Sequence, residues 1–169
     1  MKIDWTSLID PAPFQLNKSE IASPWFVVCE NIAGVTHLRI TAKGEWSLPS
    51  ICLGSFNQDG GALPGVPVTL PELAHAPFAA LVGKIGGASA GTMPPAAPGP
   101  GVTSPSPPPS PPPWPPQFDQ PFLIGALCIL ALPPDALGPL YLGFNCLIRP
   151  IEMVSLEVTV EGAIPFVTK

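Results

Sequence analysis

The sequence predicts an all-β fold, a single small sandwich of two packed sheets. Short apolar segments of strand length recur along the chain, residues typical of turns separate them, and an amphipathic helical period is almost absent. With 169 residues the chain has the size of one domain with a sizeable core. We therefore expect one β-sandwich over residues 24–169, preceded by an extended N-terminal arm over residues 1–23.

Local patterns place the expected strands. Residues 25–29 form a short apolar run, and alternation in residues 37–43 puts Leu38, Ile40 and Ala42 on one face. Alternation in the last strand puts Leu156, Val158 and Val160 inside. The full set of expected strands is 25–29, 37–43, 79–85, 122–132, 140–146 and 155–160.

The longest apolar stretch, residues 122–132, contains eleven residues. A helix that crosses a bilayer needs about 20, so we interpret this stretch as a buried strand and expect no transmembrane segment. The turn residues between 133 and 138 indicate that it pairs with the strand at 140–146. Residues 62–77 read as a long loop with one helical turn.

Two segments lie outside this regular pattern. The arm should be irregular, because Asp10-Pro11-Ala12-Pro13 interrupts it, and Trp5 and Phe14 are apolar groups for docking. The second is a proline-rich loop over residues 88–118, in which residues 94–116 hold 13 prolines in 23 positions. We expect polyproline II there, with Trp114 as its anchor and Pro108 and Pro112 as partner contacts.

Charge is scarce along the whole chain. Only 11% of the residues are charged, seven of them basic, and the net charge is −5. Seven basic residues do not make a surface that tracks nucleic-acid phosphates or anionic lipid. A surface this poor in charge indicates that a partner covers part of it. The N-terminus lacks the apolar run of a secretory signal, so we expect a cytoplasmic protein, with peripheral contact to a membrane-bound complex left open.

Residues typical of catalysis and metal binding are few and scattered. The two histidines, His37 and His75, stand apart from any serine, cysteine or carboxylate arrangement that would pair a nucleophile with a base. The four cysteines lack the spacing of a zinc or redox site. The turn at residues 57–61 offers oxygens for calcium but reads first as a plain turn. We therefore expect no enzyme and no cofactor.

Six segments, taken in order, form one pattern: residues 38–47, the turn at 57–61, and residues 76–86, 122–125, 138–145 and 155–160. Together they cover most of residues 36–161. This pattern resembles the PA-IL (LecA) family of galactose-binding bacterial lectins. The resemblance implies a small lectin-like β-sandwich, in which a calcium ion coordinates sugar hydroxyls.

The calcium ligands of that family fall on positions where this chain departs from the pattern. The family's Asn-Asp pair corresponds to Asn145-Cys146, so a neutral thiol replaces a carboxylate. The following loop, 147–154, is largely apolar and carries Arg149. Asn145 and Glu152 are the remaining candidate ligands. We expect the calcium site to be lost and sugar binding with it.

These observations predict a lectin-like sandwich that acts as an accessory or assembly subunit of a larger protein complex. It would contact partner proteins through the arm, the proline-rich loop and the 146–154 loop, with Arg149 as a directional contact to a carboxylate or phosphate. Two alternatives stay open. One is a calcium-dependent, galactose-type lectin, and the other is a proline loop that serves as ligand for an aromatic-grooved peptide-binding domain.

Overall fold

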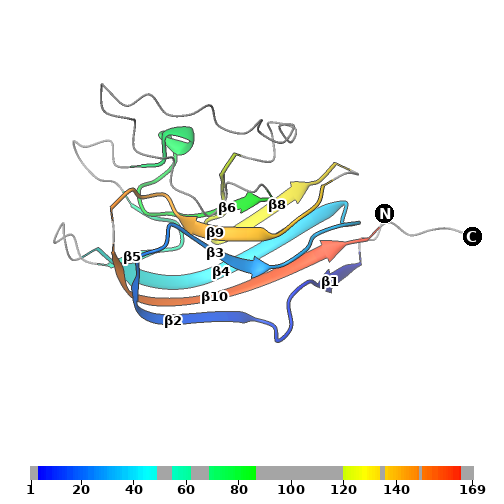
Figure 1. The fold of residues 1–169 in the computed structure, drawn as a ribbon, viewed down its shortest axis with the longest axis horizontal. Helices are drawn as coiled ribbons and strands as arrows, with labels where there is room; N and C mark the ends of the chain where they lie inside the picture. Colours follow the sequence, from blue (N-terminus) through cyan, green and yellow to red (C-terminus); the bar gives the residue numbers. More distant parts are fainter. Residues whose placement is uncertain are drawn as a thin grey trace, which may run out of the picture.

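The computed structural model consists of two antiparallel β-sheets packed face to face (Figure 1). It describes residues 4–48, 55–61, 69–86, 120–133, 136–148 and 150–164. The expected all-β sandwich is therefore confirmed. The described part contains one short 3-10 helix, η2 (Pro71–Leu73), and no helix in it is long and apolar enough to cross a membrane.

The larger sheet is built around the long strand β10 (Ile151–Ala163). On one side β10 pairs with β1 (Trp5–Ser7) and β2 (Phe14–Ile21), and on the other side with β4 (His37–Ser47). The far side of β4 is shared by β5 (Ser55–Asn57) and β8 (Leu127–Ala131). The edges of this sheet are thus β1 and β2 on one side and β5 and β8 on the other.

The smaller sheet contains four strands in the order β3, β9, β6 and β7. These are β3 (Trp25–Cys29), β9 (Leu140–Phe144), β6 (Leu81–Ile85) and β7 (Phe122–Leu123). The two-residue strand β7 forms one edge of this sheet. Because β7 and β8 are consecutive in the chain but belong to different sheets, they bring the two sheet edges together on one side of the sandwich.

The core follows the alternation of the two central strands. Leu38, Ile40 and Ala42 are buried, as are Leu156, Val158 and Val160, and these inward faces are as predicted. At one end Trp46 packs against Phe144 with ring centroids 4.5 Å apart. The buried indole Nε1–H of Trp46 donates a hydrogen bond of 3.1 Å to the carbonyl of Ala79, which satisfies its single donor.

The prediction of an irregular N-terminal arm is corrected by the structure. Residues Trp5–Ser7 and Phe14–Ile21 are strands that pair with β10, and only the segment around the two prolines between them lacks regular structure. The alternation of residues 14–21 is weak because most of this edge strand is exposed. Its pairing depends on the free side of β10, which lies more than a hundred residues away in the chain.

The hairpin predicted from residues 122–146 is also wrong. β7 pairs with β6, whereas β8 pairs with β4 and β9 pairs with β3 and β6. The chain leaves the smaller sheet at Ile124 and Gly125, whose N–H groups both donate to the carbonyl of Leu81, and Gly125 has a φ of 59°. This turn splits the apolar stretch, so that a run that looked like one buried strand becomes two edge strands in different sheets.

Several predicted sites lie outside the described residues. These are the whole proline-rich loop at 88–118, which includes Pro108, Pro112 and Trp114, together with Arg149 and Cys52, one of the four cysteines.

Candidate interaction site at the sandwich edge

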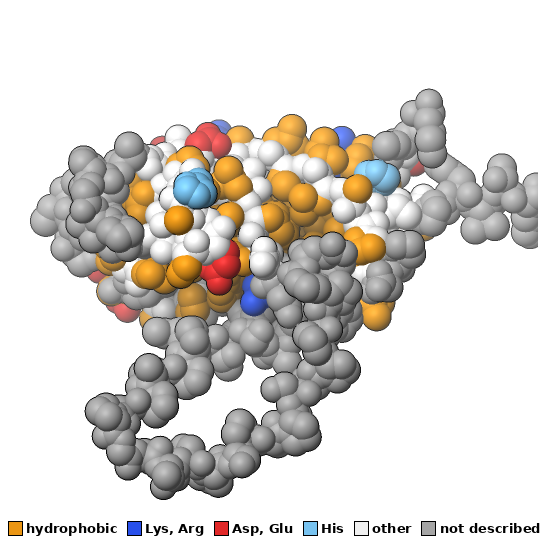
Figure 2. Space-filling model, turned by 90° about the horizontal axis from the view of Figure 1, so that it is seen from above, with side chains coloured by type: hydrophobic (Ala, Val, Ile, Leu, Met, Phe, Trp, Pro, Cys, Tyr) orange, Lys and Arg blue, Asp and Glu red, His pale blue; other side chains and the backbone are white. Residues whose placement is uncertain are grey.

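The candidate site is centred on the edge strand β8. Its inward side chains, Cys128 and Leu130, pack against the core, whereas Leu127 and Ile129 point outward and are 57% and 56% exposed. No charged residue occurs between Gln120 and Pro133, and β8 itself contains no proline, so the strand lacks the side chains that commonly keep another chain from pairing with an edge. Figure 2 shows apolar side chains gathered on the side of the molecule where β6 and β8 lie.

The backbone of β8 also presents hydrogen-bonding groups along this edge. Leu132 N–H donates to the Thr36 carbonyl at 2.8 Å, and Ala42 N–H donates to the Ala126 carbonyl at 3.0 Å. Even-numbered residues of the strand therefore direct their backbone groups towards β4. Since these groups alternate in direction along an antiparallel strand, the odd-numbered residues Leu127, Ile129 and Ala131 direct theirs outward. No strand of the described residues pairs with this side.

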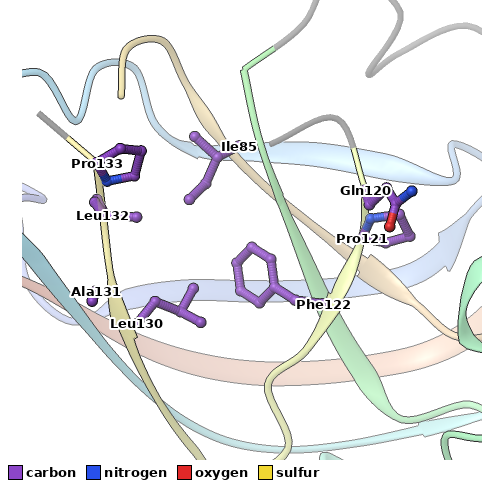
Figure 3. A pocket seen from close by; sticks show the side chains of 8 residues that line it. All are labelled: Ile85, Gln120, Pro121, Phe122, Leu130, Ala131, Leu132 and Pro133. Atoms are coloured by element: carbon purple, nitrogen blue, oxygen red, sulfur yellow. The ribbon is translucent and has the colours of Figure 1, made fainter. Parts of the chain in front are cut away.

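An apolar cleft of about 480 Å³ opens beside this edge, between β7 and β8. Figure 3 shows Phe122 from β7, Leu130 from β8 and Ile85 from β6 directed into the same space. Carbon atoms dominate the wall, and the side-chain amide of Gln120 supplies a polar group at its rim. The lining residues are Ile85, Gln120, Pro121, Phe122, Leu130, Ala131, Leu132 and Pro133.

A glycine on β6 allows Phe122 to form this wall. A Cβ built on Gly83 would lie 2.7 Å from the Phe122 ring and 2.9 Å from Ile124. A side chain at this position would push β7 away from the sheet, because real Cβ atoms do not approach that closely. The neighbouring Leu123 points outward and is 42% exposed, which extends the apolar surface from β8 onto β7.

Trp5 and Phe14 were predicted to dock on a partner, but both side chains contact the sandwich itself. Phe14 stacks on Phe26 of the opposite sheet with ring centroids 6.2 Å apart. The Trp5 ring lies 4.6 Å from the Arg39 guanidinium, whose Nε–H donates to Glu161 at 2.6 Å. This hydrogen bond raises the pKa of Arg39. Both aromatic side chains are half-buried and fasten the N-terminal strands.

Asn145, one of the two candidate calcium ligands, is fully buried and holds the loop that carries η2. Its Oδ1 accepts a hydrogen bond of 3.0 Å from Leu70 N–H. Its Nδ2 lies within 3.0–3.2 Å of the carbonyls of Leu73, Ala76 and Pro77. Glu152, the other candidate, lies within β10 opposite Glu20 and Ser47. In the described part of the chain, no three His, Cys, Asp or Glu side chains gather as a metal site.

The oxygen-rich turn at residues 57–61 follows β5 in the chain and is hydrogen-bonded to the residue before β8. Asn57 Oδ1 accepts from Asp59 N–H at 3.1 Å, and Gln58 Oε1 accepts from Gly44 N–H at 3.1 Å. Asp59 Oδ1 accepts from Ala126 N–H at 3.0 Å, and its other oxygen accepts from Gln58 Nε2. These oxygens therefore accept hydrogen bonds from the protein itself, and the bond between Asp59 and Ala126 holds the residue that directly precedes β8.

The sequence interpretation missed the β8 edge. All five residues of β8 are apolar, so the sequence has no alternation there that could tell the exposed face from the buried one. Comparisons with protein-family models, with curated proteins and with solved structures gave no match.

Proposed function

We propose that this chain is a non-enzymatic binding subunit of a larger protein assembly and that it contacts its partner through the edge formed by β7 and β8. The observation that carries the proposal is the uncharged, exposed edge strand β8, with Leu127 and Ile129 more than half exposed beside an apolar cleft. We no longer assign the partner contact to Trp5 and Phe14 of the N-terminal arm, because both aromatic side chains contact their own domain.

Two physical arguments support this assignment. An exposed apolar strand edge is a hazard that soluble proteins usually block with charges, prolines or a covering segment, and β8 carries neither charge nor proline. Covering side chains such as Leu127, Ile129 and Leu123 in an interface removes apolar surface from water, at about 25 cal/mol per Å². Addition of a strand to such an edge is a common mode of protein recognition.

The test is purification of the tagged full chain from its native source, followed by measurement of the mass and composition of the complex. We expect the wild type in a stable complex and the Ile129→Lys variant outside it, because the proposed interface would then have to cover an ammonium group in place of the exposed apolar side chain. Ser155→Lys, on an exposed position of the same sheet, is the matched control and should remain in the complex. Equal assembly of both variants would overturn the proposal.

A second candidate function, carbohydrate binding, is supported by the outer face of the larger sheet. Cross-strand neighbours there carry amides, carboxylates and hydroxyls, with Gln15 opposite Glu157 and Asn17 opposite Ser155. Together with Lys43, Glu45 and Gln58 they line a polar groove of about 530 Å³. A glycan array run with calcium and with chelator tests it, and binding lost in Gln15→Ala and Lys43→Ala variants would favour it over the assembly role.

A further inference from the structure

We infer that the partner of β8 is a second copy of this chain, and that two β8 strands pair antiparallel about a two-fold axis at Ile129. The inference rests on the proposed function and names the occupant of the same edge. The two larger sheets would then continue into one another across the dimer.

The direction of the backbone groups fixes the register. Leu127, Ile129 and Ala131 direct their N–H and C=O groups away from β4, as the hydrogen bonds at both ends of the strand require. An axis at Ile129 places this residue opposite its own copy and Leu127 opposite the second copy's Ala131. This register pairs every outward backbone group of β8, whereas an axis at either end of the strand leaves groups unpaired.

The side chains of β8 are self-complementary in this register. A two-fold contact brings identical surfaces together, so each residue must tolerate the one that symmetry places opposite it. The large Leu127 meets the small Ala131, and at the centre two β-branched isoleucines meet, a favourable cross-strand pair. Because Gln120 to Pro133 contains no charge, symmetry places no like charges together.

The other long edge of the sheet lacks these properties. β2 carries Lys18 and Glu20 on exposed positions, and charged side chains protect an edge from pairing with another chain. In the smaller sheet, β3 is irregular at Val27–Cys29 and β7 has only two residues. The remaining edge strands, β1 and β5, have three residues each, so among the described edges β8 is the one suited to a second copy.

Site-directed cross-linking of the purified full chain tests the register. In a background with its four cysteines replaced by alanine, we expect Ile129→Cys to form a covalent dimer under mild oxidation, because a hydrogen-bonded pair places its Cα atoms about 5.5 Å apart, within disulfide range. Leu127→Cys should cross-link poorly with itself but efficiently when mixed with Ala131→Cys. Ser155→Cys should remain uncross-linked. Circular dichroism verifies that each variant is folded.

Sedimentation of the protein with its native cysteines gives an independent readout. We expect the wild type to be a dimer and Ile129→Lys to dissociate with a Kd raised at least about tenfold, because two apolar contacts are lost and two like charges oppose each other. An equimolar mixture of Ile129→Lys and Ile129→Glu should regain the dimer. A wild type that stays monomeric, or a dimer that Ile129→Lys leaves intact, would overturn the inference. A monomer that still loses its native complex on Ile129→Lys substitution would retain the proposed function and refute only the second copy.

Discussion

The side-chain oxygen of Asn145 accepts the backbone N–H of Leu70 at 3.0 Å, across 75 residues of chain. Asn145 follows strand β9 and is fully buried, whereas Leu70 directly precedes the 3-10 helix η2. The amide nitrogen of the same side chain reaches three carbonyls of residues 73–77. One asparagine therefore holds a loop that has almost no regular structure of its own.

Substitution of Asn145 should destabilise the domain strongly. In Asn145→Ala, Leu70 N–H and the carbonyls around it lose their partner in a buried site, and each such loss costs about 1–3 kcal/mol. We expect the free energy of unfolding to fall by about 2–4 kcal/mol in urea denaturation. Asn17→Ala, on an exposed position of β2, should change it by less than about 0.5 kcal/mol. Similar small effects of both would contradict the role given to Asn145.

Calcium should have no effect on stability. Asn145 Oδ1 and the side-chain oxygens of Asn57, Gln58 and Asp59 accept hydrogen bonds from the protein, so a calcium ion would have to displace those donors. We expect the same melting temperature with millimolar calcium as with chelator. A rise in melting temperature that chelator reverses would support the calcium-dependent lectin instead.

Gly60 should tolerate a side chain less well than Gly34, although both have positive φ angles of 71° and 80°. A Cβ at Gly60 would collide with the Phe78 carbonyl and lie 2.6 Å from Ala80 N, whereas a Cβ at Gly34 meets nothing within 4 Å. Gly34→Ala should therefore show only the backbone cost of about 1–2 kcal/mol. Gly60→Ala should lower the free energy of unfolding by a clearly larger amount, and an equal loss would contradict the packing of this turn.

Alkaline pH should weaken the fold through two thiols. Burial raises the pKa of Cys29 and Cys128 above the ordinary value of 9.0. The unfolded chain then releases these protons at lower pH than the folded chain, so stability is intact below pH 9.0 and falls as pH rises through the folded values. Denaturant titrations in the range of about pH 8 to 10 should show a smaller loss for a Cys29→Ala, Cys128→Ala double variant. An identical pH dependence of both proteins would exclude this linkage.

The sequence was sufficient to predict the inward faces of the two central strands. In β4 and β10 apolar residues alternate with polar ones, and because the side-chain period of a strand is two residues, the alternation alone selects Leu38, Ile40, Val158 and Val160 for the core. The turn at residues 57–61 was predicted from its residue types, because asparagine, aspartate and glycine are common in turns. Both features are set by residues that are adjacent in the sequence, so they can be predicted from a short segment alone.

The candidate site could not be predicted in this way, because it depends on which strands become neighbours. In residues 122–132 both faces are apolar, so the sequence did not indicate that the chain changes sheets at Gly125 or that Ile129 is exposed at an edge. Likewise the strands at Trp5–Ser7 and Phe14–Ile21 exist because β10 has a free side for them. Which strands pair is decided only in the tertiary structure, because it depends on hydrogen bonds and packing between segments that are far apart in the sequence.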